Sequence, residues 1–197
     1  MAFTATPWGY DVDGTLPPLI TDSEFDSMTG GKWAEDSRIV PTIEAASAAI
    51  RARCGWHVYP SMSCRATLDA DGSRSLWLPT SHLSGVTSLE VDGDEMSGYQ
   101  WSKLGQVLPA DRVAPGLQAV TATYTAGFDE LPADIAATVA GAVVRAVAMS
   151  YGVTAESAGG VSVSYANGAA YGGAGVSLTD ADLAAIGQYR AVRAHAV

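Results

Sequence analysis

One segment, "LPADIAATVAGAVVRAVAMSYG" (131–152), limits most strongly what this chain can fold into. Pro132 near its start, Asp134 in the first turn and a glycine after its end are typical helix boundaries, and they predict a helix over about 133–150. After Asp134 its only charged residue is Arg145. A helix that is apolar on nearly every side must be covered on nearly every side. In a chain of 197 residues we therefore expect a neighbouring subunit to cover part of it, and the alternative is a plain central core helix.

Three further helices follow from capping residues and from apolar residues spaced three or four apart. Thr21 or Asp22 can cap the first helix, and Thr179 can cap the last with a capping-box pattern. An apolar stripe that begins at Ile39 runs along the second helix. We predict these helices over about 22–29, 37–54 and 180–194.

The remaining segments predict strands, turns and irregular stretches. Two runs that each contain an Asp–Gly turn indicate β-hairpins over about 61–78 and 86–108, and a further strand lies within 117–128. Residues 1–20 contain several Pro and Gly and no sustained periodicity, so we expect an extended, irregular N-terminal arm. The Gly-, Ala- and Ser-rich segment 155–178 is either a loop or a hairpin that orders only against a partner.

Together these elements predict an α+β fold, with a small helical bundle core and β-hairpin insertions in a single domain over 21–197. Nearly half of the residues (48%) are apolar, which argues against global disorder. No apolar run approaches the ~20 residues of a membrane span, and the N-terminus lacks the basic start and apolar core of a secretory signal. We therefore expect a soluble protein made in the cytosol. The two cysteines, Cys54 and Cys64, fit neither a disulfide framework nor a zinc cluster.

Charge is unevenly distributed along the chain. The net charge of −10 opposes sequence-independent DNA binding, which depends on Lys and Arg side chains. Residues 1–50 carry eight acidic residues against only Lys32 and Arg38, whereas no acidic residue follows Asp182. This asymmetry indicates two differently solvated faces, two different protein partners, or head-to-tail packing of identical subunits.

The stretch "DVDGT" (11–15) matches the signature of haloacid-dehalogenase-like phosphatases, in which the first Asp attacks phosphorus beside Mg²⁺. That chemistry needs an apolar strand before the motif and a helix after it. Pro and Gly precede Asp11, and two prolines follow Asp13, so we interpret 11–14 as a turn in the acidic arm. A Mg²⁺-dependent hydrolase that uses Asp11 and Asp13 remains an alternative. The histidines lie in separate segments without ligand or triad spacing, so we expect no catalytic residues, no metal and no cofactor.

Five segments in a fixed order carry a family resemblance: "TDSEFDSMTGGKW", "IEAASAAIRARCGWHVYP", "LWLPTSHLSGVTSLEVDG", "YQWSKLGQVLP" and "VTATYTAGFDELPADIAATVAGAVVRAV". The most specific pieces are the Ala-rich helix that ends in Cys54-Gly55-Trp56, and the stretch from Tyr124 to Phe128 that leads into "LPAD". Over about residues 19–195 the chain resembles the head–tail connector, or adaptor, proteins of long-tailed double-stranded-DNA bacteriophages.

The resemblance implies a structural virion protein with an all-helical core and hairpin insertions, made in the host cytoplasm and located in the head–tail neck. It implies a dodecameric ring beneath the portal that extends the DNA channel, without sequence-specific DNA binding, and that docks a stopper or tail-completion protein. The C-terminal segment would engage the portal through Leu183, Ile186, Tyr189, Arg190 and Arg193. The second face of the apolar helix would pack against the adjacent subunit through Ala136, Ala140, Gly141, Val144 and Ala148.

Two further alternatives remain open. Another neck component, such as a stopper or tail-completion protein, belongs to the same class, but stoppers tend to be small β-barrels and the predicted helices argue against one. A host-derived interaction domain that works as a monomer or dimer belongs to a different class.

Overall fold

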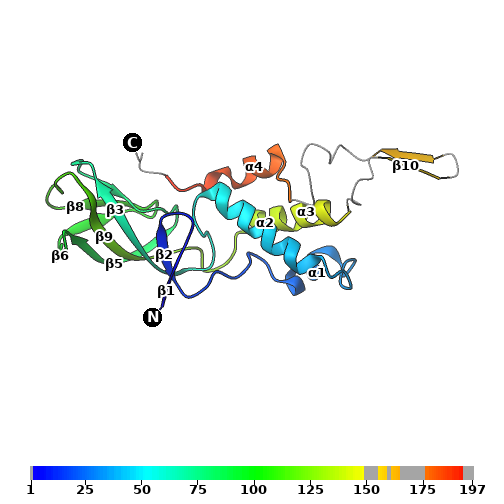
Figure 1. The fold of residues 1–197 in the computed structure, drawn as a ribbon, viewed down its shortest axis with the longest axis horizontal. Helices are drawn as coiled ribbons and strands as arrows, with labels where there is room; N and C mark the ends of the chain where they lie inside the picture. The colour runs from blue at the N-terminus through cyan, green and yellow to red at the C-terminus, as the bar shows by residue number, and fades with distance from the viewer. Residues whose placement is uncertain (1, 149–154, 159–160, 165–175, 193–197) are drawn as a thin grey trace. The chain divides into compact units, whose positions relative to one another are not determined.

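The chain folds into two compact units, and the computed structural model describes residues 2–148, 155–158, 161–164 and 176–192 (Figure 1). The β unit comprises Met1–Pro17, Arg51–Pro132 and Gly187–Val197, and the helical unit comprises Pro18–Ile50 and Ala133–Ile186. Each unit is therefore built from stretches far apart in the sequence. The predicted α+β class is confirmed. Among the described residues, no helix is long and apolar enough to cross a membrane.

The β unit contains a six-stranded sheet in the order β1-β2-β3-β9-β5-β6. Its strands are β1 (Phe3–Ala5), β2 (Tyr10–Asp13), β3 (Met62–Ala70), β5 (Leu83–Val91), β6 (Asp94–Glu95) and β9 (Gly116–Ala126). A smaller sheet in the order β4-β8-β7 consists of β4 (Leu76–Trp77), β7 (Tyr99–Trp101) and β8 (Gln106–Pro109). All neighbouring strands in both sheets are antiparallel.

The centre of the large sheet is β9, an eleven-residue strand that pairs with β3 on one side and β5 on the other. Val120, Ala122, Tyr124 and Ala126 are fully buried, whereas the residues between them are only half-buried. This period of two is the strand pattern that the sequence shows. β9 therefore connects the end of the sheet near Gly116 with the end near Ala126.

The predicted irregular arm is wrong for residues 3–13, which form the β1–β2 hairpin at one edge of the large sheet. The backbone N–H and the hydroxyl of Thr6 both donate to the carbonyl of Tyr10, at 3.0 and 2.6 Å, and close the hairpin turn. Tyr10 and Val12 are almost fully buried, at 3% and 1% exposed. Two buried residues are too short a pattern to indicate a strand in a stretch interrupted by Pro7 and Gly9.

Neither predicted hairpin pairs as expected. Within 61–78, β3 pairs with β2 and β9, whereas β4 belongs to the smaller sheet. Within 86–108, a tight turn at Asp92 and Gly93 joins β5 to β6, but β7 pairs with β8. Asp–Gly turns are local signals, whereas pairing between strands far apart in the sequence leaves no local signal.

The helical unit contains α1 (Asp22–Thr29), most of α2 (Ile39–Cys54), α3 (Ala133–Ala148) and α4 (Asp180–Ile186). A capping box begins α1: the Thr21 hydroxyl accepts from the Glu24 N–H (3.2 Å), and the Glu24 carboxylate accepts from the Thr21 N–H (2.7 Å). The predicted helix over 180–194 is too long. After Ile186 the chain forms a 3-10 turn, η2 (Gly187–Tyr189), which belongs to the β unit.

The helical unit buries a core of its own, with almost fully buried side chains from α1, α2 and α3: Phe25, Ile43, Ala46, Ile50, Ile135, Val139 and Val143. The large sheet buries a separate set of side chains in the β unit, so hairpins inserted into one helical bundle do not describe the whole fold. Within the Gly-rich segment, β10 (Ala155–Ala158) pairs antiparallel with β11 (Val161–Ser164). Residues 159–160 and 165–175 of that segment lie outside the described residues.

Candidate interaction surfaces

Residues 187–191 contact the rest of the β unit through Cys54, Trp56, Ser81 and Phe128. We call this set of contacts the C-terminal clamp. The carbonyl of Tyr189 accepts a hydrogen bond from Nε1 of Trp56 (2.6 Å) and another from the Ser81 hydroxyl (3.1 Å). The N–H of Ala191 donates to the carbonyl of Cys54 (2.9 Å), the last residue of α2. This bond satisfies one of the carbonyls that a helix leaves unpaired at its C-terminus.

Aromatic rings fill the clamp. The ring of Tyr189 meets Phe128 edge-on, with centroids 5.7 Å apart, and Phe128 in turn lies against the His82 ring at 4.2 Å. Trp56 is fully buried, and its ring centroid lies 6.2 Å from that of Phe128. Aromatic pairs of this kind contribute about 0.5–1.5 kcal/mol each beyond the area they bury. The clamp therefore holds the C-terminal segment through both its backbone and the Tyr189 side chain.

Next to the clamp lies a buried histidine that the sequence analysis did not single out. Nε2 of His57 donates to the carbonyl of Ala126 (3.0 Å), because a carbonyl oxygen can only accept. Nδ1 therefore accepts from the Tyr10 hydroxyl (2.8 Å), which itself accepts from the His57 backbone N–H (2.9 Å). Burial lowers the pKa of His57 to about 4, so the imidazole is neutral at neutral pH. Burial also raises the pKa of Tyr10 and keeps its phenol protonated.

Arg51 and Gly127 complete this network. Arg51 is 5% exposed, and its guanidinium donates to the carbonyls of His57 (2.8 Å) and Tyr59 (2.7 Å). Burial lowers the pKa of Arg51 to about 10, so the side chain stays charged at neutral pH. Gly127 has φ +110, and a β-carbon there would overlap the carbonyl of Pro60 and lie 2.8 Å from Nε2 of His57. The two most specific pieces of the family resemblance thus meet in one cluster.

The structure places the five expected portal contacts in different surroundings. Arg190 is exposed and Leu183 is half-buried. Ile186 is fully buried within the chain, and Tyr189 belongs to the clamp. Arg193 lies outside the described residues. Of the described candidates, Arg190 is therefore the most accessible to a partner, while Ile186 acts in the fold itself.

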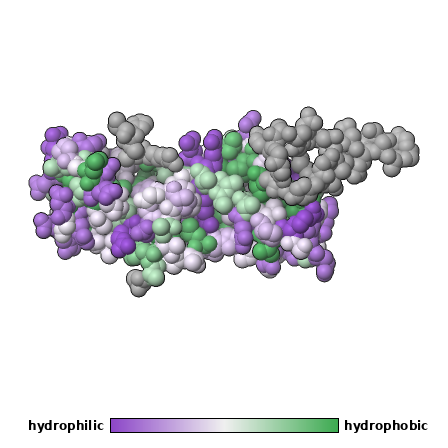
Figure 2. Space-filling model, viewed as in Figure 1, coloured by the Kyte–Doolittle hydropathy of each residue, from purple (hydrophilic) through white to green (hydrophobic). Residues whose placement is uncertain are grey.

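The expected subunit interface on α3 is partly accessible. The first face of the helix is closed, since Ile135, Val139 and Val143 are fully buried. On the second face Ala140 is nearly buried, Ala136, Gly141 and Val144 are half-buried, and Ala148 at the end of the helix is exposed. Figure 2 shows hydrophobic residues at the surface of the helical unit near α4.

The single basic residue of α3, Arg145, is paired within the chain. Nη2 of Arg145 donates to the carboxylate of Asp182 in α4 (2.5 Å). The same carboxylate accepts from the N–H and the hydroxyl of Thr179, at 2.8 and 2.9 Å, and the Thr179 hydroxyl accepts from the Asp182 N–H (3.2 Å). The predicted capping box is confirmed, with Asp in the place of Glu. This carboxylate therefore both caps α4 and joins it to α3.

The phosphatase-like motif lies on a strand. Asp11 and Asp13 alternate along β2 with buried Tyr10 and Val12, so both carboxylates point away from the core. Asp11 lies 3.5 Å from the guanidinium of Arg65, its register partner on β3. The interpretation of 11–14 as a turn is thus wrong, because the strand continues to Asp13. Among the described residues, no three His, Cys, Asp or Glu side chains gather in a way that could hold a metal ion.

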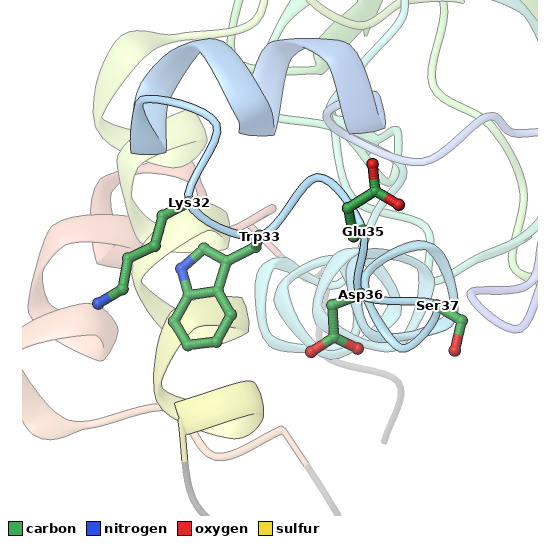
Figure 3. A pocket seen from close by; sticks show the side chains of 5 residues that line it. All are labelled: Lys32, Trp33, Glu35, Asp36 and Ser37. Atoms are coloured by element: carbon green, nitrogen blue, oxygen red, sulfur yellow. The ribbon is translucent and has the colours of Figure 1, made fainter.

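A shallow, open hollow lies in the connection between α1 and α2, lined by Lys32, Trp33, Glu35, Asp36 and Ser37 (Figure 3). The ammonium of Lys32 lies 5.1 Å from the centroid of the Trp33 ring. Figure 3 shows Glu35 and Asp36 pointing in opposite directions. Asp36 is held by a bidentate contact to Arg38, and these hydrogen bonds lower its pKa to about 2. The polar side chains of the hollow therefore do not converge on one point.

Comparison with family models identifies one family. The model of the family described as "Head completion protein" matches residues 18–173, well over half of the chain. A search of curated proteins finds no match. Among solved structures, a chain from the "Neck of native GTA particle computed with C12 symmetry" has a TM-score of 0.58 and 19% sequence identity, covering 100% of this chain and 99% of that one. The chain therefore belongs to the head completion protein family, and it shares its fold with a protein of that neck.

Proposed function

We propose that this chain forms a ring between the portal and the next component of the neck, where it extends the DNA channel and completes the head after packaging. The family match over residues 18–173 carries this proposal. The likeness of the whole chain to a protein from a neck computed with C12 symmetry supports a ring, and a dodecamer within it. In this role the protein acts by assembly in the virion and not as an enzyme.

Neighbouring subunits would meet at the second face of α3. A ring needs a heterologous contact, in which two different surfaces of the same subunit meet. The residues proposed for one of them are small and partly accessible: Ala136, Ala140, Gly141, Val144 and Ala148. Small side chains let the backbone of a neighbouring subunit approach closely. Val144 is the largest of these side chains. If the neighbouring subunit covers it, a charge placed there would be buried in the assembled ring at a cost in free energy.

The portal contact would lie at the C-terminal end. Arg190 is exposed beside the clamp, and Arg193 follows it in the sequence, so a complementary portal surface would be acidic. Leu183, which is half-buried, would add apolar contact. Ile186 and Tyr189 would contribute from inside the chain, by fixing the point at which the C-terminal residues leave it.

Passage of DNA would need no binding site. The net charge of −10 leaves the protein without the excess of Lys and Arg that grips phosphates. A ring of such subunits would guide DNA without holding it. The alternative assignment within the same neck, a stopper or tail-completion protein, predicts instead that the chain does not bind the portal directly.

Native mass measurement of the purified protein, with and without its portal protein, tests the proposal. We expect a ring, or a monomer that joins the portal as a ring. The substitution Val144→Glu should abolish ring formation, whereas the matched control Val40→Glu, at a side chain 52% exposed on α2, should leave it unchanged. A monomer that ignores the portal would refute the proposed function.

A further inference from the structure

Three turns meet at the end of the large sheet that lies opposite the C-terminal clamp. They are the turn at 69–72 after β3, the turn at 92–93 after β5, and the segment 115–119 around the start of β9. Leu117 lies in the third turn and is 86% exposed, more than any other large apolar side chain among the described residues. An isolated exposed leucine needs no explanation by itself. The backbone that carries this leucine is unusual, however.

The backbone beside Leu117 is held in place from both sides. Gln118 has φ +53, a left-handed conformation that costs free energy for a residue other than glycine. Its N–H donates to the Asp69 carboxylate (2.7 Å), and the N–H of Asp92 donates to the carbonyl of Ala119 (2.8 Å). These two hydrogen bonds hold the strained backbone of residues 118–119 in place, and the neighbouring Leu117 side chain is exposed to solvent. Because the backbone is already fixed, binding at Leu117 has to order only the side chain, which favours its use as a docking anchor.

The charged residues within these three turns are all acidic. Asp69, Asp71 and Asp92 belong to the same turns and are exposed, and hydrogen bonds from Ser73 lower the pKa of Asp71. The three turns, with sequences "DADG", "DG" and "PGLQA", contain no Lys or Arg. The complementary surface is therefore an apolar pocket bordered by basic side chains.

The position of Leu117 separates it from the proposed portal contact. β9 runs from this end of the sheet to Ala126, and Phe128 of the clamp follows two residues later. Leu117 and Gly127 are ten positions apart, which corresponds to about 33 Å along an extended strand. One end of the β unit thus holds the C-terminal segment and the other presents Leu117.

We propose that Leu117, within the carboxylates of Asp69, Asp71 and Asp92, is the anchor that docks the next neck component on the tail side. This inference rests on the proposed function, since it assumes that the C-terminal end of the β unit faces the portal. The partner is a different protein, such as the stopper or tail-completion protein, with an apolar pocket bordered by Lys or Arg.

The experiment measures binding of the purified stopper or tail-completion protein, encoded with the portal, to the assembled ring. Leu117→Ser should weaken this binding at least tenfold and leave the ring mass and portal binding unchanged. The matched control Leu104→Ser, at a leucine 58% exposed on the same unit, should leave all three unchanged. Asp69→Asn keeps an oxygen for the Gln118 N–H and should weaken binding less, with a smaller dependence on salt. Asp69→Ala also removes that acceptor and should weaken binding further.

Each other outcome overturns a specific statement. If the wild-type protein does not bind the portal, the proposed function fails before any variant is compared. If the wild-type protein binds the portal and Leu117→Ser holds the tail-side protein as well as wild type does, the docking site fails and the proposed function stands. Loss of ring formation or of portal binding in Leu117→Ser would make this leucine a contact between copies or with the portal, and would overturn the tail-side assignment.

Discussion

The buried His57 makes the stability of the β unit depend on pH in a defined window. Its pKa is lowered by burial from 6.5 to about 4, and its ring nitrogens are both engaged, by Tyr10 and by the carbonyl of Ala126. The unfolded chain therefore binds a proton on this imidazole below about pH 6.5, whereas the folded chain does so only near pH 4. Between these values the unfolded state binds more protons, so the free energy of unfolding rises with pH. The gap between the two pKa values corresponds to about 3 kcal/mol, present in full above pH 6.5 and lost as the pH falls to about 4.

Urea unfolding of the wild type and of His57→Gln, at steps from pH 4 to pH 8, measures this contribution. The difference in unfolding free energy between the two proteins should shrink by about 3 kcal/mol between pH 7 and pH 4. Carboxylates that titrate in the same range are present in both proteins and cancel in the difference. Two parallel curves would refute the reasoning. Where the variant does not fold, an NMR titration of the His57 ring in the wild type replaces it, and a midpoint near 6.5 would be equally decisive against it.

Two further substitutions probe the same cluster. Gly127→Ala should lower the free energy of unfolding by more than about 2 kcal/mol, because its β-carbon would overlap a carbonyl, whereas Gly93→Ala, also at positive φ but in open space, should cost about 1 kcal/mol; equal losses in urea unfolding would contradict this. Trp56→Phe removes the indole N–H that bonds to the carbonyl of Tyr189 and should cost about 1–2 kcal/mol. It should also speed tryptic cleavage after Arg190, and an unchanged cleavage rate would mean that the clamp does not hold the segment.

The sequence predicts elements whose signals are local. The cap at Thr21 and the apolar run of α3 lie within a few residues of the structure they specify, so their helices are placed from the sequence alone. The turn at Asp92 and Gly93 is local in the same way. The partners of β3 are β2 and β9, which lie far from it in the sequence. The sequence instead predicts a hairpin with the strand that follows the turn. Alternation indicates a strand but says nothing about its neighbours.

For the candidate contact residues, too, local patterns are predictable and contacts between distant segments are not. Apolar spacing identified Ile186 as part of an amphipathic surface, but a stripe on a helix cannot tell whether its own chain or a partner covers it. In the structure, Ile186 is buried by its own chain, and the carbonyl of Tyr189 accepts hydrogen bonds from Trp56 and Ser81. The network of His57 could not be predicted, since its members come from β2, the end of α2 and the end of β9.

The register of β2 explains why the carboxylates of an apparent catalytic motif lie at the surface. The pleat sends alternate residues to opposite faces, so Tyr10 and Val12 enter the core while Asp11 and Asp13 stay outside. Tyr10 is required inside, because its hydroxyl both donates to and accepts from His57. A shift by one residue that brought the carboxylates inward would break this network and bury two charges among apolar side chains. The packing of Tyr10 and Val12 therefore keeps the two aspartates at the surface. The hydrogen bonds between Tyr10 and His57 fix this register of β2.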